Sequence, residues 1–167
     1  MDRASAAEFE AMIDAEFSRS EGRVILVDGF NVLHAVLLGK ERDQGWWRRE
    51  PRERLLRRIS AWQSGPGEIW VAFDGTQPAW AVWTEPTAIP RTKRSQSATV
   101  HCLFVESADD WIVRRARRTK HPERTIVVSG DRKVTGRARS AGCEIWTPWA
   151  LISRCPTLDA ELSGRCS

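Results

Sequence analysis

Short apolar segments that end in or just before an acidic residue recur along the chain of 167 residues. Residues 23–28 (RVILVD) and 68–74 (EIWVAFD) have this form, and residues 99–105, 125–129 and 143–146 are further segments of similar length. Each is long enough for a buried strand and too short for a typical helix. Apolar residues on both faces are typical of strands inside a parallel sheet that helices cover.

Helical patterns separate these segments. They cover residues 31–38, 51–62, 107–119, 132–141 and 149–154. Strands that alternate with helices at this spacing predict an α/β fold with three layers, a central parallel sheet flanked by helices. The length suits one domain. We expect it to cover residues 22–154, with a C-terminal tail at 155–167.

The first 21 residues predict an acidic amphipathic helix ahead of this domain. Ser5 and Glu8 fit a capping box. Apolar side chains recur at helical spacing at Phe9, Met12, Ile13 and Phe17. The segment has no apolar signal core, and no run in the chain is long enough to span a bilayer. We therefore expect a cytoplasmic protein without a membrane partner. The sequence does not predict the oligomeric state.

The net charge of +4 is unevenly distributed. Residues 114–139 contain ten Lys and Arg residues against Glu123 and Asp131. This concentration suggests a polyanionic partner, and solvated helix faces are the alternative explanation.

Acidic residues follow the predicted strands. Asp28, Asp74 and Glu106 follow the first three, Asp131 lies just past the fourth, and Asp109 lies in the first turn of a helix. The carboxyl ends of parallel strands open on one crevice, so we expect these acids to converge there. The alternative for Asp28 and Asp74 is a role in a turn, because each precedes a glycine.

Two adjacent acids, Asp109 and Asp110, are expected to have different roles. Asp109 shares a helix face with Ile112, Val113 and Ala116, so it points toward the sheet, whereas Asp110 is expected in solvent. Helix capping by either acid is the alternative.

Several ionised carboxylates in one crevice repel each other unless a cation neutralises them. Oxygen ligands favour Mg²⁺ or Mn²⁺, and a water activated by such an ion is a nucleophile for phosphodiester hydrolysis. The pattern therefore predicts metal-dependent hydrolysis of a nucleic acid. A phosphatase-like hydrolase is disfavoured, because the first strand lacks a second Asp two residues after Asp28.

Four motifs resemble the YacP-like branch of NYN domains, which belong to the PIN-like nuclease superfamily. They are DGFNVLH at 28–34, FDG at 73–75, ESAD at 106–109 with Ile112, and SGD at 129–131. The resemblance covers residues 23 to about 150. It implies a PIN-like fold and an endoribonuclease that cleaves single-stranded RNA (mRNA, rRNA or tRNA). Some members of the branch act on translating ribosomes.

The resemblance also implies the roles of individual residues. Asp28, Asp74, Asp109 and Asp131 would hold Mg²⁺ or Mn²⁺, with Glu106 as a further candidate ligand. Asn31 would orient Asp28 or a metal-bound water, and Ser129 would support the site. Members of this branch often carry a Glu where this chain has Val113. That departure leaves open a non-catalytic RNA- or ribosome-binding module on the same fold.

Residues outside the carboxylate set suggest how RNA is bound. The segment from Gly75 to about Ser97 has no periodicity and contains basic and tryptophan side chains. The candidate RNA-binding residues are Arg91, Lys93, Arg94, Arg132, Lys133 and Trp80. The four cysteines lack metal-binding spacing, so we expect reduced thiols, with a structural zinc site as the alternative. His34 is expected to be packed or partly exposed rather than catalytic.

Overall fold

The computed structural model describes residues 3–19, 22–37, 49–62, 67–75 and 98–156. Five parallel strands form one sheet in the order β3-β2-β1-β4-β5. The strands are β1 (Arg23–Asp28), β2 (Gly67–Asp74), β3 (Thr99–Val105), β4 (Thr125–Val128) and β5 (Glu144–Trp146). The chain winds one way from β1 to β3 and the other way from β4 to β5, so the carboxyl ends of β1 and β4 flank the crevice of this fold class.

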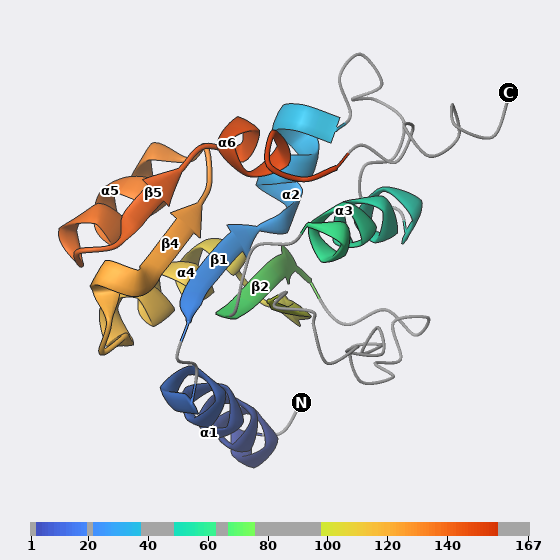
Figure 1. Ribbon diagram of the computed structural model, residues 1–167. Coiled ribbons are helices and arrows are strands. Elements are labelled where there is room, and N and C mark those ends of the chain that lie inside the picture. Colours follow the sequence, from blue (N-terminus) through green and yellow to red (C-terminus); the bar gives the residue numbers. More distant parts are fainter. Residues whose placement is uncertain (1–2, 20–21, 38–48, 63–66, 76–97, 157–167) are drawn as a thin grey trace, which may run out of the picture.

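Helices cover both faces of the sheet (Figure 1). One face packs against α2 (Gly29–Val32), the π-helical turn η1 (Leu33–Leu37), α3 (Arg49–Ala61) and α6 (Pro148–Ile152). The other face packs against α1 (Arg3–Arg19), α4 (Ala108–Arg118) and α5 (Arg132–Ser140), and the short helix η3 (Pro122–Arg124) precedes β4. The predicted three-layer α/β fold is thus confirmed.

Strand β1 shows why both faces of the sheet are apolar. Ile25 and Val27 lie in the core beneath α2, α3 and α6, while Val24 and Leu26 lie in the core beneath α1, α4 and α5. Successive side chains of a strand point to opposite faces, so a strand covered on both sides needs an unbroken apolar run. The run ends at Asp28, the first polar residue at the carboxyl edge.

The N-terminal helix differs from its predicted form. It begins at Arg3, so Ser5 lies inside the helix and the predicted capping box is wrong. Met12 is 58% exposed rather than part of the packed face. Ile13 is fully buried, and the Phe17 ring lies 5.3 Å from the Trp70 ring on β2. Glu10 and Asp14 lie at helical spacing beside them, so the packed stripe of α1 alternates acidic and apolar side chains.

Other predicted boundaries shift by a few residues. The helix expected over 31–38 begins at Gly29 and continues as the π-helical turn η1. The last helix begins at Pro148, with Thr147 as its N-cap. Within the described ranges, no helix has both the length and the apolar character needed to cross a membrane.

Candidate active site

Asp28 lies at the end of β1, the central strand of the sheet. Its side chain is almost fully buried, and its Oδ1 accepts a hydrogen bond from the Asn31 N–H at 3.2 Å, which makes it the N-cap of α2. Gly29 allows this arrangement, because a Cβ at that position would come within 2.3 Å of Cε1 of Phe73. The Phe73 ring of β2 therefore packs directly against the turn that carries Asp28.

Two further carboxylates act on Asp28. The pKa of Asp28 is raised from its ordinary value of 3.8 to about 7, chiefly by burial of the carboxyl group, while the hydrogen bond from Asn31 lowers it. A hydrogen bond with the Asp109 side chain and repulsion by Asp109 and Asp74 contribute to this rise. The structure thus brings Asp28, Asp74 and Asp109 to the same edge, as residues from β1, β2 and α4.

The connection between β3 and α4 contacts Asp74, the last residue of β2, and leads into the helix that carries Asp109. Asp74 is exposed, and its Oδ1 accepts a hydrogen bond from the Ala108 N–H at 2.8 Å. Ser107 is the N-cap of α4, its Oγ accepting from the Asp110 N–H, so neither acid of the pair caps this helix. Asp109 is half-buried and Asp110 exposed, in the orientations that the helical spacing predicts.

Asp131 and Ser129 lie on the turn between β4 and α5. Ser129 is buried and its Oγ accepts a hydrogen bond from the Asp131 N–H at 3.1 Å. Oδ1 of Asp131 accepts from the Lys133 N–H at 2.7 Å, so this carboxylate caps α5. The Asn31 side chain joins this turn to the rest of the site, because its Oδ1 accepts from the Gly130 N–H at 2.7 Å.

Glu106, the remaining candidate ligand, and Val113, which stands where family members often carry a Glu, do not belong to this group of carboxylates. Glu106 is exposed, and it is not among the groups that shift the pKa of Asp28. Val113 is 5% exposed and packs in the core with α1 and α5, so this position serves packing in this chain.

The chemistry of the donor set fits a hard divalent ion, because it consists of carboxylate oxygens. Within the described ranges, however, no three acidic, histidine or cysteine side chains converge closely enough to hold one metal ion. Asp109 lies close enough to Asp28 to raise its pKa, and Oδ1 of Asp131 is engaged as a cap. The fit therefore requires Asp28 to be ionised and Asp131 to turn from its cap.

The other predicted binding residues divide into two groups. Arg132 and Lys133 are exposed in the first turn of α5, directly after Asp131. Trp80, Arg91, Lys93 and Arg94 lie outside the described residues. His34 is exposed on η1.

The three described cysteines, Cys102, Cys143 and Cys155, are free thiols. Burial raises the pKa of the Cys102 thiol to about 12 and that of Cys155 to about 11, so both stay protonated at neutral pH and are poor zinc ligands.

One buried cation beside the site was not anticipated from the sequence. Arg52 of α3 is buried, and its guanidinium lies over the rings of Phe30 and Phe104, at 5.9 and 5.2 Å from their centroids. Phe30 is the second residue after Asp28. Arg52 belongs to a helix with several other arginines, and its sequence position gives no signal that distinguishes it from them.

Comparisons with known proteins agree with this architecture. A family model described as the YacP-like NYN domain matches residues 25–166. The crystal structure of Rae1 (YacP) from Bacillus subtilis is similar, with a TM-score of 0.58 and 20% sequence identity, over 85% of this chain and 78% of that chain. A tryptophan-to-leucine mutant of Rae1 gives the same TM-score and 19% identity, over 86% and 80% of the two chains.

The likeness to these structures concerns the fold, and a search of the curated proteins gave no match. The family model, in contrast, spans most of the chain and includes all four carboxylates at the crevice. The chain therefore belongs to the YacP-like NYN domain family, a family of PIN-like nucleases.

Proposed function

We propose that this protein is a metal-dependent endoribonuclease that hydrolyses phosphodiester bonds in single-stranded RNA. The observation that carries the proposal is the burial of Asp28 beside Asp109 and Asp74 at the carboxyl edge of the sheet. A buried acid whose pKa is raised by burial and by neighbouring carboxylates is typical of functional sites, because folding alone gains nothing from it. Membership of a nuclease family supports the same conclusion.

The geometry supports the following division of roles. Asp28 and Asp109 would hold Mg²⁺ or Mn²⁺, with Asp74 and Asp131 as further or water-mediated ligands. A bound ion of this kind lowers the pKa of a water molecule and offsets charge on the phosphodiester. The Asn31 N–H orients Asp28, and the Asn31 side chain fixes the turn that carries Asp131. Arg132 and Lys133, which directly follow Asp131, would bind the phosphates of the RNA strand.

The test compares two neighbouring acids of α4. Asp109→Asn is expected to abolish cleavage of a labelled single-stranded RNA in Mn²⁺ or Mg²⁺, whereas Asp110→Asn, on the exposed side of the helix, is expected to cleave normally. EDTA should stop the wild-type reaction, and an excess of Mn²⁺ should restore it. Cleavage that survives both Asp109→Asn and EDTA would exclude this mechanism.

A non-catalytic RNA-binding module is the second candidate. The observation that favours it is the lack of a ready three-ligand metal group in the described part of the chain. RNA binding without any metal-dependent product, across substrates of varied sequence, would establish it. Association with ribosomes, proposed from the family resemblance alone, is tested for either candidate by cosedimentation with ribosomes in a sucrose gradient.

A further inference from the structure

The arginines of α4 fall into two groups that differ in their partners. On the side that faces α1, the buried Arg115 contacts Glu10 and Asp14, and Arg118 contacts Asp14 at 3.0 Å. Arg114 lies 3.9 Å from Glu10. Arg117 is exposed and forms no ion pair with any described residue. The N-terminal helix thus neutralises one side of α4 and leaves the other side charged.

The exposed face of α5 continues this uncompensated charge. Its buried residues are Val134 and Ala138, and all its other long side chains are basic. Six cations of α4, α5 and the segment after α4 are exposed and have no ion pair within the described ranges; we call them the basic ridge. They are Arg117, Lys120, Arg132, Lys133, Arg137 and Arg139.

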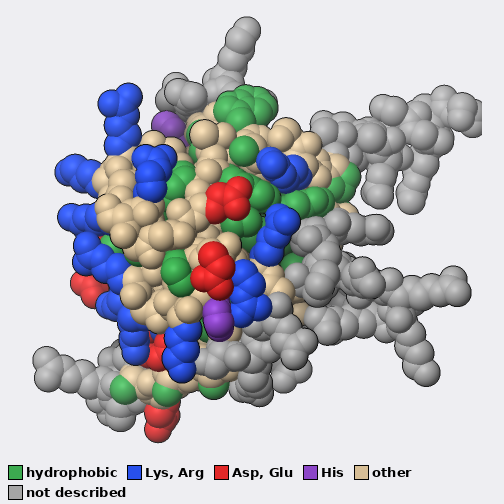
Figure 2. Space-filling model, turned by 60° about the vertical axis from the view of Figure 1, so that its left-hand side comes forward, with side chains coloured by type: hydrophobic (Ala, Val, Ile, Leu, Met, Phe, Trp, Pro, Cys, Tyr) green, Lys and Arg blue, Asp and Glu red, His purple; other side chains and the backbone are tan. Residues whose placement is uncertain are grey.

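The basic ridge extends from the carboxyl ends of the strands toward the ends at which the strands begin. Both helices run antiparallel to the strands, so Arg132 and Lys133 lie at the carboxyl edge beside Asp131, while Arg139 and Lys120 lie toward the opposite edge. Helices α4 and α5 pack against each other. Figure 2, which brings the α5 side forward, shows Lys and Arg side chains along the left margin of this face, with few acids between them.

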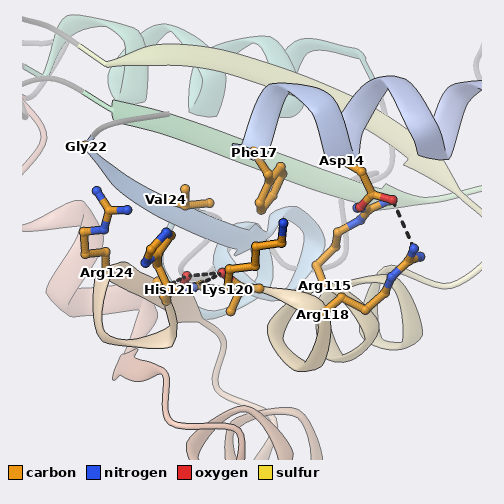
Figure 3. Close-up of a pocket in the computed structure, with 11 residues that line it drawn as sticks. Asp14, Phe17, Gly22, Val24, Arg115, Arg118, Lys120, His121 and Arg124 are labelled. Atoms are coloured by element: carbon orange, nitrogen blue, oxygen red, sulfur yellow. Dashed lines mark hydrogen bonds and ion pairs between the residues drawn. The ribbon is translucent and has the colours of Figure 1, made fainter. Parts of the chain in front are cut away.

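A pocket of about 380 Å³ lies at the far end of the basic ridge, between α1, the start of β1 and the segment that connects α4 to β4. In Figure 3, His121 and Arg124 point from this segment toward the side of Gly22 and Val24, and Lys120 points toward Phe17. The turn after α5 adjoins the same segment, because a Cβ at Gly142 would lie 3.3 Å from Cβ of Pro122. The pocket therefore continues the ridge at the edge of the sheet opposite Asp28.

We propose that the basic ridge binds the phosphate backbone of the RNA strand as it leaves the catalytic crevice, and that the pocket receives one of its phosphates. Uncompensated cations on neighbouring elements suit a polyanion, because each phosphate contact releases condensed counterions. A lone phosphate ion would need only the pocket, whereas the ridge suits a strand of several nucleotides. The inference rests on the proposed function and adds to it a second binding surface, remote from the reacting bond.

The first experiment measures binding in EDTA, where cleavage is not expected, by fluorescence anisotropy of labelled single-stranded RNAs. The double variant Arg117→Glu with Arg139→Glu is compared with Arg54→Glu plus Arg57→Glu, which changes the charge equally on α3, beneath the other face of the sheet. For an RNA of about 16 nucleotides, the ridge variant should bind at least ~10-fold more weakly, and its salt dependence should fall by about 0.7 per lost contact. The α3 variant should bind like the wild type.

RNA length and the pocket provide the second readout. With an RNA of about two nucleotides, which is too short to extend from the carboxylates along α5 to the far end of the ridge, the ridge variant should equal the wild type. Lys120→Gln with Arg124→Gln should raise KM for the long RNA and leave kcat unchanged, since neither residue lies near the carboxylates. Inorganic phosphate should compete with the long RNA for binding to the wild type and should not weaken its binding to the variant with Lys120→Gln and Arg124→Gln. A duplex that binds more tightly than the single strand would contradict the proposed ligand.

The outcomes separate this inference from the proposed function. Equal loss of binding in the ridge and α3 variants, or no loss in either, overturns the basic ridge as a binding surface even if Asp109 proves essential for cleavage. Ridge-dependent binding without any metal-dependent cleavage overturns the nuclease proposal and retains the ridge. Circular dichroism checks the fold of each variant, and Arg117→Gln with Arg139→Gln replaces the ridge variant if charge reversal unfolds it.

Discussion

Asp28 and Arg115 are both buried, and their surroundings are opposite. Arg115 is 2% exposed and lies between Glu10 and Asp14, which supply its counter-charge from another helix. Asp28 is 5% exposed and lies beside Asp109 and Asp74, and no basic side chain is among the groups that shift its pKa. One buried charge is compensated within the chain, and the other is surrounded by charge of its own sign.

The difference separates a structural charge from a functional one. A buried ion pair is tolerable when both partners and their hydrogen bonds are present, and it fixes how two elements pack. Arg115 thereby ties α1, which precedes the matched family domain, to α4. A buried carboxylate among other carboxylates gives no such benefit, so its counter-charge must come from a ligand.

The largest effect is expected at Asp28, the buried charge without a counter-charge. Asp28→Asn should lower the rate of RNA cleavage by about 1,000-fold, equivalent to about 4 kcal/mol of transition-state stabilisation. The metal-free protein should become more stable at pH 8, because the substitution removes a buried charge without changing the side-chain volume. Cleavage in single-turnover assays and urea unfolding in EDTA measure the two effects. A variant that loses both activity and stability would show that Asp28 is structural.

At Arg115, the buried charge with counter-charges, we expect a substitution to lower stability and to leave activity unchanged. Arg115→Met keeps the length of the side chain but leaves Glu10 and Asp14 without their buried partner, and should cost about 3 kcal/mol of unfolding free energy. Cleavage at low temperature should be unaffected, because Arg115 lies more than a helical turn beyond Asp109 on α4 and contacts α1 rather than the carboxylates of the site. Urea denaturation checks the first effect. A loss below about 1 kcal/mol would mean that α1 is held mainly by Ile13 and Phe17.

The pH dependence of stability sharpens the comparison. The pKa of Asp28 is raised from 3.8 to about 7 in the folded protein, so between these values the folded state binds more protons than the unfolded state. Stability in EDTA should therefore fall as the pH rises from 4 to 7, by about 2 to 4 kcal/mol. Asp28→Asn should remove this part of the dependence, and Mn²⁺ should oppose it in the wild type. A wild type and variant with parallel pH profiles would contradict the raised pKa.

The sequence predicted the layers and most strands because burial on both faces leaves a strong pattern, as in residues 24–27 of β1. It also predicted the orientation of Asp109, since helical spacing determines which side chains share a face. The sequence did not predict contacts between residues that are distant in the chain. Nothing in the local pattern indicates that Asn31 would bond Gly130, or that Arg115 would contact α1, because both contacts depend on how separate elements pack. For the same reason, Met12 could not be distinguished from Ile13.

The smallest effect is expected at Arg118, the exposed arginine that contacts Asp14. Arg118 contacts Asp14 at 3.0 Å, but both side chains are largely in solvent, at 52% and 40% exposure. Arg118→Gln should therefore cost about 0.5 kcal/mol or less, and added salt should remove the difference. Arg115→Met should remain destabilising at high salt, because its guanidinium is shielded from solvent ions. The two substitutions share Asp14, so the ratio of their costs measures how far burial, rather than ion pairing itself, makes a charge structural. Equal costs for both would mean that burial contributes nothing to the attachment of α1.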